Sequence, residues 1–130
     1  MLEVLIPRRP LSLQANNRKL QQWKVFVRSE AEKVWTEPTI HSGDLHVTIV
    51  YLCGETPPDV DNIIKPIQDA LRGLVYSDDA IVADVDSHRR PIVGTFDLTR
   101  LPALLLSGIA SQAECVYLKV SRSHSLEDYL

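Results

Sequence analysis

Residues 59–79 read DVDNIIKPIQDALRGLVYSDD, an apolar helix pattern with an acidic pair at each end. Isoleucine, alanine and leucine side chains recur at the spacing of one helix face: Ile63, Ile67, Ala70, Leu71 and Leu74. Pro66 lacks an amide donor, so the helix either begins with Pro66 in its first turn or bends there. Gly73 is a suitable C-terminal stop.

The first acidic pair is predicted to lie beside the start of this helix. Pro57 and Pro58 favour an extended chain, in which Asp59 and Asp61 would point to the same side. Asp61 is also placed to cap the helix through its side chain. From Asp61, a lysine and a further aspartate follow at four-residue steps, at positions 65 and 69, along one side of a helix.

Carboxylates crowded in this way repel one another unless a cation lies between them. The neighbourhood contains no histidine or cysteine, so hard oxygen ligands predict Mg²⁺, with Mn²⁺ as a substitute, and not zinc. The two acidic pairs supply the expected ligands, which are Asp59, Asp61, Asp78 and Asp79. Such an ion assists attack on a phosphodiester, and Lys65 would hold the phosphate or the attacking water.

The run DVDNIIKPIQDAL, followed by Ser77-Asp78-Asp79, resembles the signature of the RusA-type endodeoxyribonucleases, Holliday junction resolvases common in phages and prophages. The resemblance implies a homodimer that nicks four-way DNA junctions with magnesium. Carried onto this chain residue by residue, it implies catalytic roles for Asp59, Asp61, Lys65 and Asp79. Asp69 and Asp78 are further candidates.

The net charge of −3 is unusual for a protein that binds DNA, but the charge is unevenly distributed. Residues 1–33 hold seven basic and three acidic side chains, whereas residues 59–86 hold seven aspartates against two basic side chains. The expected DNA contacts are Arg8, Arg9, Arg18, Lys19, Arg89 and Arg90. A solvated basic loop is the alternative interpretation of the first four.

The remaining pattern predicts an α+β fold. Alternating apolar residues predict strands over residues 1–6, 45–53, 80–88 and 114–120, and a possible short strand over residues 91–95. Helical spacing predicts helices over residues 20–35 and 99–109, the second capped by Asp97 or Thr99 and stopping near Gly108. The expected architecture is a two-layer α/β arrangement, a RusA-like mixed β-sheet covered by two main helices.

We expect residues 1–130 to form one nuclease domain with a frayed tail over residues 121–130. No apolar run approaches a membrane span and no secretory signal begins the sequence, so we expect a cytoplasmic protein without membrane contact. Cys53 and Cys115 are expected to be buried free thiols, and Trp23 and Trp35 to belong to the core.

Two alternatives to a junction-resolving endonuclease remain at this point. One is a non-catalytic nucleic-acid-binding module of the same fold, and the other is a metal-dependent nuclease that acts on flaps or other branched DNA. Residues 97–113 look longer than the matching connection in typical family members. Their Leu104-Leu105-Leu106 run would cover the sheet or join a dimer interface, and a core role is favoured.

Overall fold

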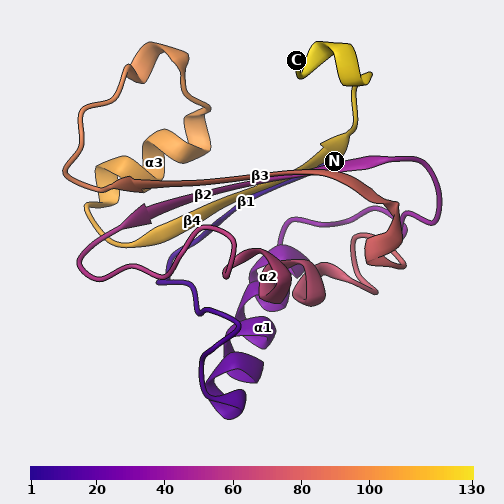
Figure 1. Ribbon diagram of the computed structural model, residues 1–130, viewed down its shortest axis with the longest axis horizontal. Helices are drawn as coiled ribbons and strands as arrows, with labels where there is room; N and C mark the ends of the chain where they lie inside the picture. Colours follow the sequence, from indigo (N-terminus) through magenta and orange to yellow (C-terminus); the bar gives the residue numbers. More distant parts are fainter.

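A computed structural model describes residues 1–130 and contains one four-stranded sheet with the strand order β1-β4-β2-β3. The elements along the chain are β1 (Leu2–Ile6), α1 (Asn17–Glu32), β2 (Leu45–Cys53), α2 (Ile64–Leu71), η1 (Asp79–Ile81), β3 (Val82–Pro91), η2 (Leu98–Arg100), α3 (Ala103–Ser111), β4 (Cys115–Arg122) and η3 (Leu126–Asp128). The long helix α1 and the short helix α2 lie on one side of the sheet, and α3 lies on the other (Figure 1). This is the expected α+β architecture.

The sheet is mixed, with one parallel and two antiparallel strand pairs. β2 and β3 run parallel, since the chain crosses from the end of one to the start of the other through α2. β4 is antiparallel to both β1 and β2. This order leaves β3 at an open edge of the sheet, directly after the acidic residues 78 and 79.

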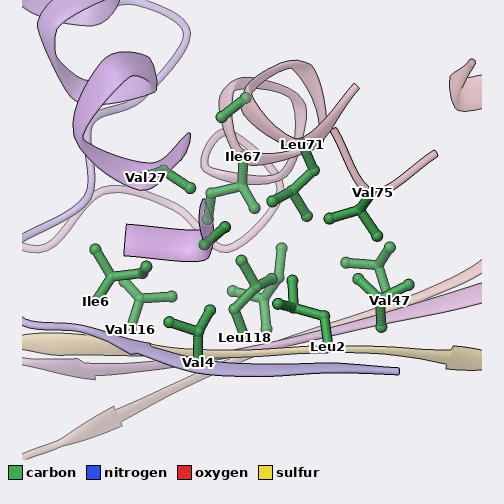
Figure 2. Close-up of a cluster of buried hydrophobic side chains, with 14 of the residues drawn as sticks. Leu2, Val4, Ile6, Val27, Val47, Ile67, Leu71, Val75, Val116 and Leu118 are labelled. Carbon is green, nitrogen blue, oxygen red and sulfur yellow. The ribbon is translucent and has the colours of Figure 1, made fainter. Parts of the chain in front are cut away.

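Alternating side chains of the strands and one stripe from each helix form the main core. Figure 2 shows Val27 of α1 and Ile67 and Leu71 of α2 above the inward-facing side chains of the sheet. Within β1 the alternation predicted for residues 1–6 is confirmed, because Leu2, Val4 and Ile6 are all buried. The packed sheet therefore fixes where α2 lies, and with it the position of Lys65.

The opposite face of the sheet is covered at one end by α3. Leu105 packs there with Leu52, Cys115 and Tyr117, which confirms a core role for part of the leucine run. Gly108 lies inside α3 and does not end it. A Cβ atom at Gly108 would lie 3.0 Å from the Cys115 sulfur, so the glycine permits close approach of the helix to the sheet.

Several predicted boundaries were wrong. α1 begins at Asn17, three residues early, because the Asn16 side chain caps it by accepting the amides of residues 18 and 19. It also ends earlier than expected. Residues 79–81 form the 3₁₀ turn η1 and not the start of a strand, and β3 then continues to Pro91, so no separate strand covers 91–95. The predicted helix over 99–109 is divided into η2, capped by Asp97, and α3.

The last strand extends to Arg122, past the expected start of the tail. Beyond it η3 lies on the α3 side of the sheet (Figure 1), where the Tyr129 hydroxyl is 3.3 Å from Nδ1 of His46. Both cysteines are free and buried, and both tryptophans are buried, as predicted. No helix in the structure has the length and apolar character needed to cross a membrane.

Candidate active site

A tight turn delivers the chain from the acidic pair to α2. The Asn62 amide donates to the Asp59 carbonyl at 3.1 Å, so this segment is a turn and the extended geometry predicted from the prolines was wrong. Side-chain capping by Asp61 was also wrong, because Ile63 occupies the cap position with no side-chain cap bond. α2 begins at Ile64 and has Pro66 in its first turn, where a missing amide donor costs nothing.

A chain of ion pairs joins α1, α2 and η1. Nζ of Lys65 lies 2.5 Å from Oδ2 of Asp79 and 3.1 Å from Oδ1 of Asp69. The second oxygen of Asp69 lies 3.3 Å from Nζ of Lys24 on α1. Lys65 is thus held between two carboxylates from different elements, and these contacts fix the position of its ammonium group.

The ion pairs that Lys65 and Asp69 make stabilise the charged forms of these two groups. Hydrogen bonds to Asp79 and then to Asp69 raise the pKa of Lys65 above its ordinary value, so the ammonium stays protonated at neutral pH. Burial acts to raise the pKa of Asp69, but hydrogen bonds from Lys65 and Lys24 outweigh it, and the pKa falls below its ordinary value. Asp69 therefore remains a carboxylate that can hold Lys65.

The Asp79 side chain has an unused acceptor. Its Oδ1 is buried and has no hydrogen-bond partner, while Oδ2 accepts from Lys65. A buried carboxylate oxygen without a partner is costly, and a hard divalent cation is a suitable partner for it. The predicted ligands of the two acidic pairs are all carboxylates, which agrees with the chemistry expected for Mg²⁺ or Mn²⁺.

The structure does not gather the predicted metal ligands into one preformed cluster. No three histidine, cysteine, aspartate or glutamate side chains come together in a metal-holding group. The Asp59 side chain is 75% exposed, and Asp61 is exposed in the same turn. Asp78 uses one oxygen to accept the Ala80 amide at 3.0 Å, so it caps η1. Of the predicted catalytic residues, only Lys65 and Asp79 are in direct contact.

The loop before the acidic turn is held by a polar network at the ends of β2 and β4. Glu114 accepts hydrogen bonds from the Tyr51 hydroxyl and the Gly54 amide, both at 2.9 Å, and from Arg9 at 3.2 Å. Arg9 also donates to the carbonyls of Glu55 and Thr56. This network fixes the end of the loop that leads into the acidic turn.

β3 and the N-terminal loop hold the acidic turn itself. The Ser87 hydroxyl donates to the Val60 carbonyl at 2.7 Å, and Arg89 donates to the Pro58 carbonyl at 3.0 Å. The Arg89 guanidinium also lies 4.0 Å from the Asp59 carboxylate. The Leu13 amide donates to the Asn62 carbonyl at 3.0 Å. The backbone of the turn is fixed while its carboxylates stay in solvent.

The six basic residues predicted to contact DNA lie in three different settings. Arg9 and Arg89 are engaged in holding the acidic loop. Arg90 lies on the other face of β3, as alternation along a strand requires, and donates to the Arg89 carbonyl. The remaining three, Arg8, Arg18 and Lys19, are exposed near the start of α1 and make no ion pair.

Sequence reasoning missed three residues that organise this region: Lys24, Tyr51 and Glu114. Lys24 was one charge on the exposed side of a helix pattern, and its contact with Asp69 depends on how α1 crosses α2. Glu114 lies directly before β4, sixty residues from Gly54 in sequence. An acidic residue at a strand end was the only local signal available.

Comparison with protein families shows a match over residues 13–93 to the family described as endodeoxyribonuclease RusA. The match spans α1, β2, α2 and β3, and therefore every residue of the ion-pair chain and the acidic turn. A search of curated proteins found no significant match.

Proposed function

This chain belongs to the RusA endodeoxyribonuclease family and is a metal-dependent Holliday junction resolvase, and from this premise we propose which residues do the chemistry. The proposed catalytic residues are Asp59, Asp61, Lys65 and Asp79. The observation that carries the proposal is the contact of Lys65 with Asp79, because it joins a cation on α2 to a carboxylate beyond the next turn.

We propose Mg²⁺ as the metal ion, with Mn²⁺ as a substitute. Asp59, Asp61 and Asp79 would hold it, with Asp78 as a further ligand. When bound, such an ion neutralises charge on the phosphate and lowers the pKa of a coordinated water. The unpartnered Oδ1 of Asp79 supports this choice. The exposed carboxylates of the acidic turn also support it, because they can rotate without breaking a hydrogen bond to the core.

Lys65 would act on the phosphodiester itself. Its ammonium is kept protonated by Asp79 and Asp69, and it has three donors, of which two are used. The remaining donor is free for a non-bridging oxygen of the scissile phosphate, whose negative charge increases as the water attacks. Asp69 and Lys24 would position Lys65 without touching the substrate.

We also propose that the active form is a homodimer. A four-way junction presents two equivalent strands, so paired symmetric nicks need two active sites related by a twofold axis. The mass in solution, measured by light scattering, tests this directly. Dimers mixed from wild-type and Asp79→Asn chains give a second test, because each mixed dimer should nick one strand and leave the other intact.

A substrate panel tests the activity. Labelled four-way junction, flap and linear duplex are incubated with the chain and Mg²⁺, and the cleavage positions are mapped on each strand. We expect paired nicks at symmetric positions of the junction and at least a tenfold lower rate on the other substrates. Cleavage of the flap alone would show that the substrate is flap DNA and not the four-way junction. Titration with Mn²⁺ tests the ligands, since unchanged affinity in Asp61→Asn would exclude that residue.

A further inference from the structure

A pocket of about 260 Å³ lies at the start of α1, separate from the Lys65 and Asp79 site. Its lining consists of Arg8, Arg9, Leu11, Lys19, Gln22 and Trp23. No acidic side chain lines it, and the first turn of α1 contains none. The positive end of the helix dipole therefore adds to the side-chain charges.

Two of the three cations in the lining are available to a ligand. The Arg8 guanidinium lies 4.0 Å from the centre of the Phe26 ring, which holds it in place without using its hydrogen-bond donors. Lys19 is exposed and makes no ion pair. Arg9, by contrast, donates to Glu114 and to two carbonyls, and these contacts hold it in the wall of the pocket.

Trp23 provides a second, independent feature of the pocket. It lines the pocket and is 1% exposed, yet its indole N–H has no hydrogen-bond partner. The indole N–H of Trp35 also lacks a partner, but Trp35 lines no pocket. A residue of the pocket lining thus has an unused donor, and a bound oxyanion accepts from donors of this kind.

We propose that this pocket binds a backbone phosphate of one DNA arm of the junction, outside the scissile position. The proposal rests on the proposed DNA-cleaving function. Lys19 precedes Lys24, the α1 end of the ion-pair chain, by five residues, which is about 7.5 Å along a helix. The pocket and the ion-pair chain therefore share α1, and a phosphate held in the pocket is distinct from the one that is cut. A duplex arm held at both the scissile phosphate and the pocket phosphate has a defined direction, whereas a single contact would let it rotate.

The test measures junction binding against salt concentration. The full chain carries Asp79→Asn to suppress nicking, and binding of a labelled four-way junction is followed by fluorescence anisotropy in 50–300 mM KCl. Arg8→Gln and Lys19→Gln should each weaken binding several-fold, and should each make the slope of log affinity against log salt less negative by about 0.9. The control is Lys33→Gln, which removes the same charge at the C-cap of α1, where the lysine is 69% exposed and pairs with Glu30. It should leave the slope unchanged.

An unchanged slope in both pocket variants would overturn the phosphate site. In that event the chain with Asp79 restored would still nick junctions, whereas failure of the proposed function would appear as absence of nicking by the unmutated chain. With Asp79 restored, Lys19→Gln should raise KM and leave kcat within about twofold, because the pocket does not touch the reacting phosphate.

Trp23 fluorescence identifies the source of the phosphate. In a Trp35→Phe chain, whose fold is first checked by circular dichroism, the junction should shift or quench Trp23 emission, and 10 mM inorganic phosphate or dAMP should have little effect. A tight response to inorganic phosphate or dAMP, with none to the junction, would overturn the assignment to the DNA backbone. Absence of any response would overturn the pocket as a ligand site.

Discussion

Lys65 on α2 and Asp79 in η1 are fourteen residues apart in sequence, and their side chains meet at 2.5 Å. The contact exists because α2 packs its apolar stripe on the sheet and the Gly73 turn then returns the chain to the start of β3. Gly73 has φ of +84°, a conformation that glycine adopts without strain. The pairing joins α2 to the second acidic pair of the 59–79 segment through a single cation.

Replacement of Lys65 by methionine should reduce junction cleavage by about 10²–10³-fold, the usual effect of removing one donor to a developing oxyanion. Junction affinity should change by only a few fold, because one cation among many is lost. Single-turnover nicking and anisotropy measure the two quantities. The control is Lys33→Met, at the exposed C-cap of α1, which should change neither the nicking rate nor the junction affinity. A wild-type nicking rate for Lys65→Met would show that the lysine takes no part in the reaction.

Replacement of Glu114 by alanine should destabilise the protein by about 1–3 kcal/mol, since the Tyr51 hydroxyl and the Gly54 amide lose their common acceptor. Nicking should slow as well, because the loop that leads to Asp59 loses an anchor. Urea unfolding and the nicking rate measure both effects. Glu114→Gln should recover part of the stability, and Glu127→Ala, an exposed control in η3, should be neutral. If the Glu114→Ala chain were as stable as wild type, the Glu114 network would not contribute to the stability of the fold.

The pH dependence of stability should show the contribution of the Asp69 ion pairs to folding. Its pKa is lowered in the folded protein, so its contribution is present above the ordinary value of 3.8 and is lost as the pH falls through the folded value. The destabilisation caused by Asp69→Asn, about 1–2 kcal/mol at pH 7, should therefore shrink near pH 3. Urea titrations at the two pH values measure it, and an equal loss at both would contradict the ion-pair assignment.

Ile67 is fully buried between α2 and the sheet, at the centre of the surface that positions Lys65. Ile67→Ala should cost about 2–5 kcal/mol, because it leaves a cavity in the main core. Val25 on α1 is 67% exposed, so Val25→Ala should change the free energy of unfolding by no more than about 0.5 kcal/mol. Equilibrium unfolding compares the two, and similar losses would mean that the α2 stripe does not carry the packing.

The parts of the fold that follow from local periodicity could be predicted from the sequence. β2 was predicted with its observed bounds, because alternation over nine residues has no competing pattern. The apolar stripe of α2 and its stop at Gly73 were also correct. The division of residues 79–91 into η1 and one long strand was missed, since Asp78 caps the turn with its own side chain.

The candidate site was only partly predictable, because its contacts are set by tertiary packing. The Lys65 and Asp79 pair joins two ends of a recognised motif, whereas the contact of Lys24 with Asp69 depends on the crossing of α1 and α2. Arg9 and Arg89 were predicted to contact DNA, and this stays a prediction. Their guanidinium groups also donate to carbonyls of the loop and turn around Asp59, which no sequence pattern encodes.

The decisive experiment compares wild type with Asp79→Asn on one labelled four-way junction, with Mg²⁺ and with EDTA. We expect paired symmetric nicks by wild type only with Mg²⁺, and a rate at least about 10²-fold lower for Asp79→Asn at unchanged junction affinity. Nicking by Asp79→Asn at the wild-type rate would contradict the central role of the Lys65 and Asp79 pair.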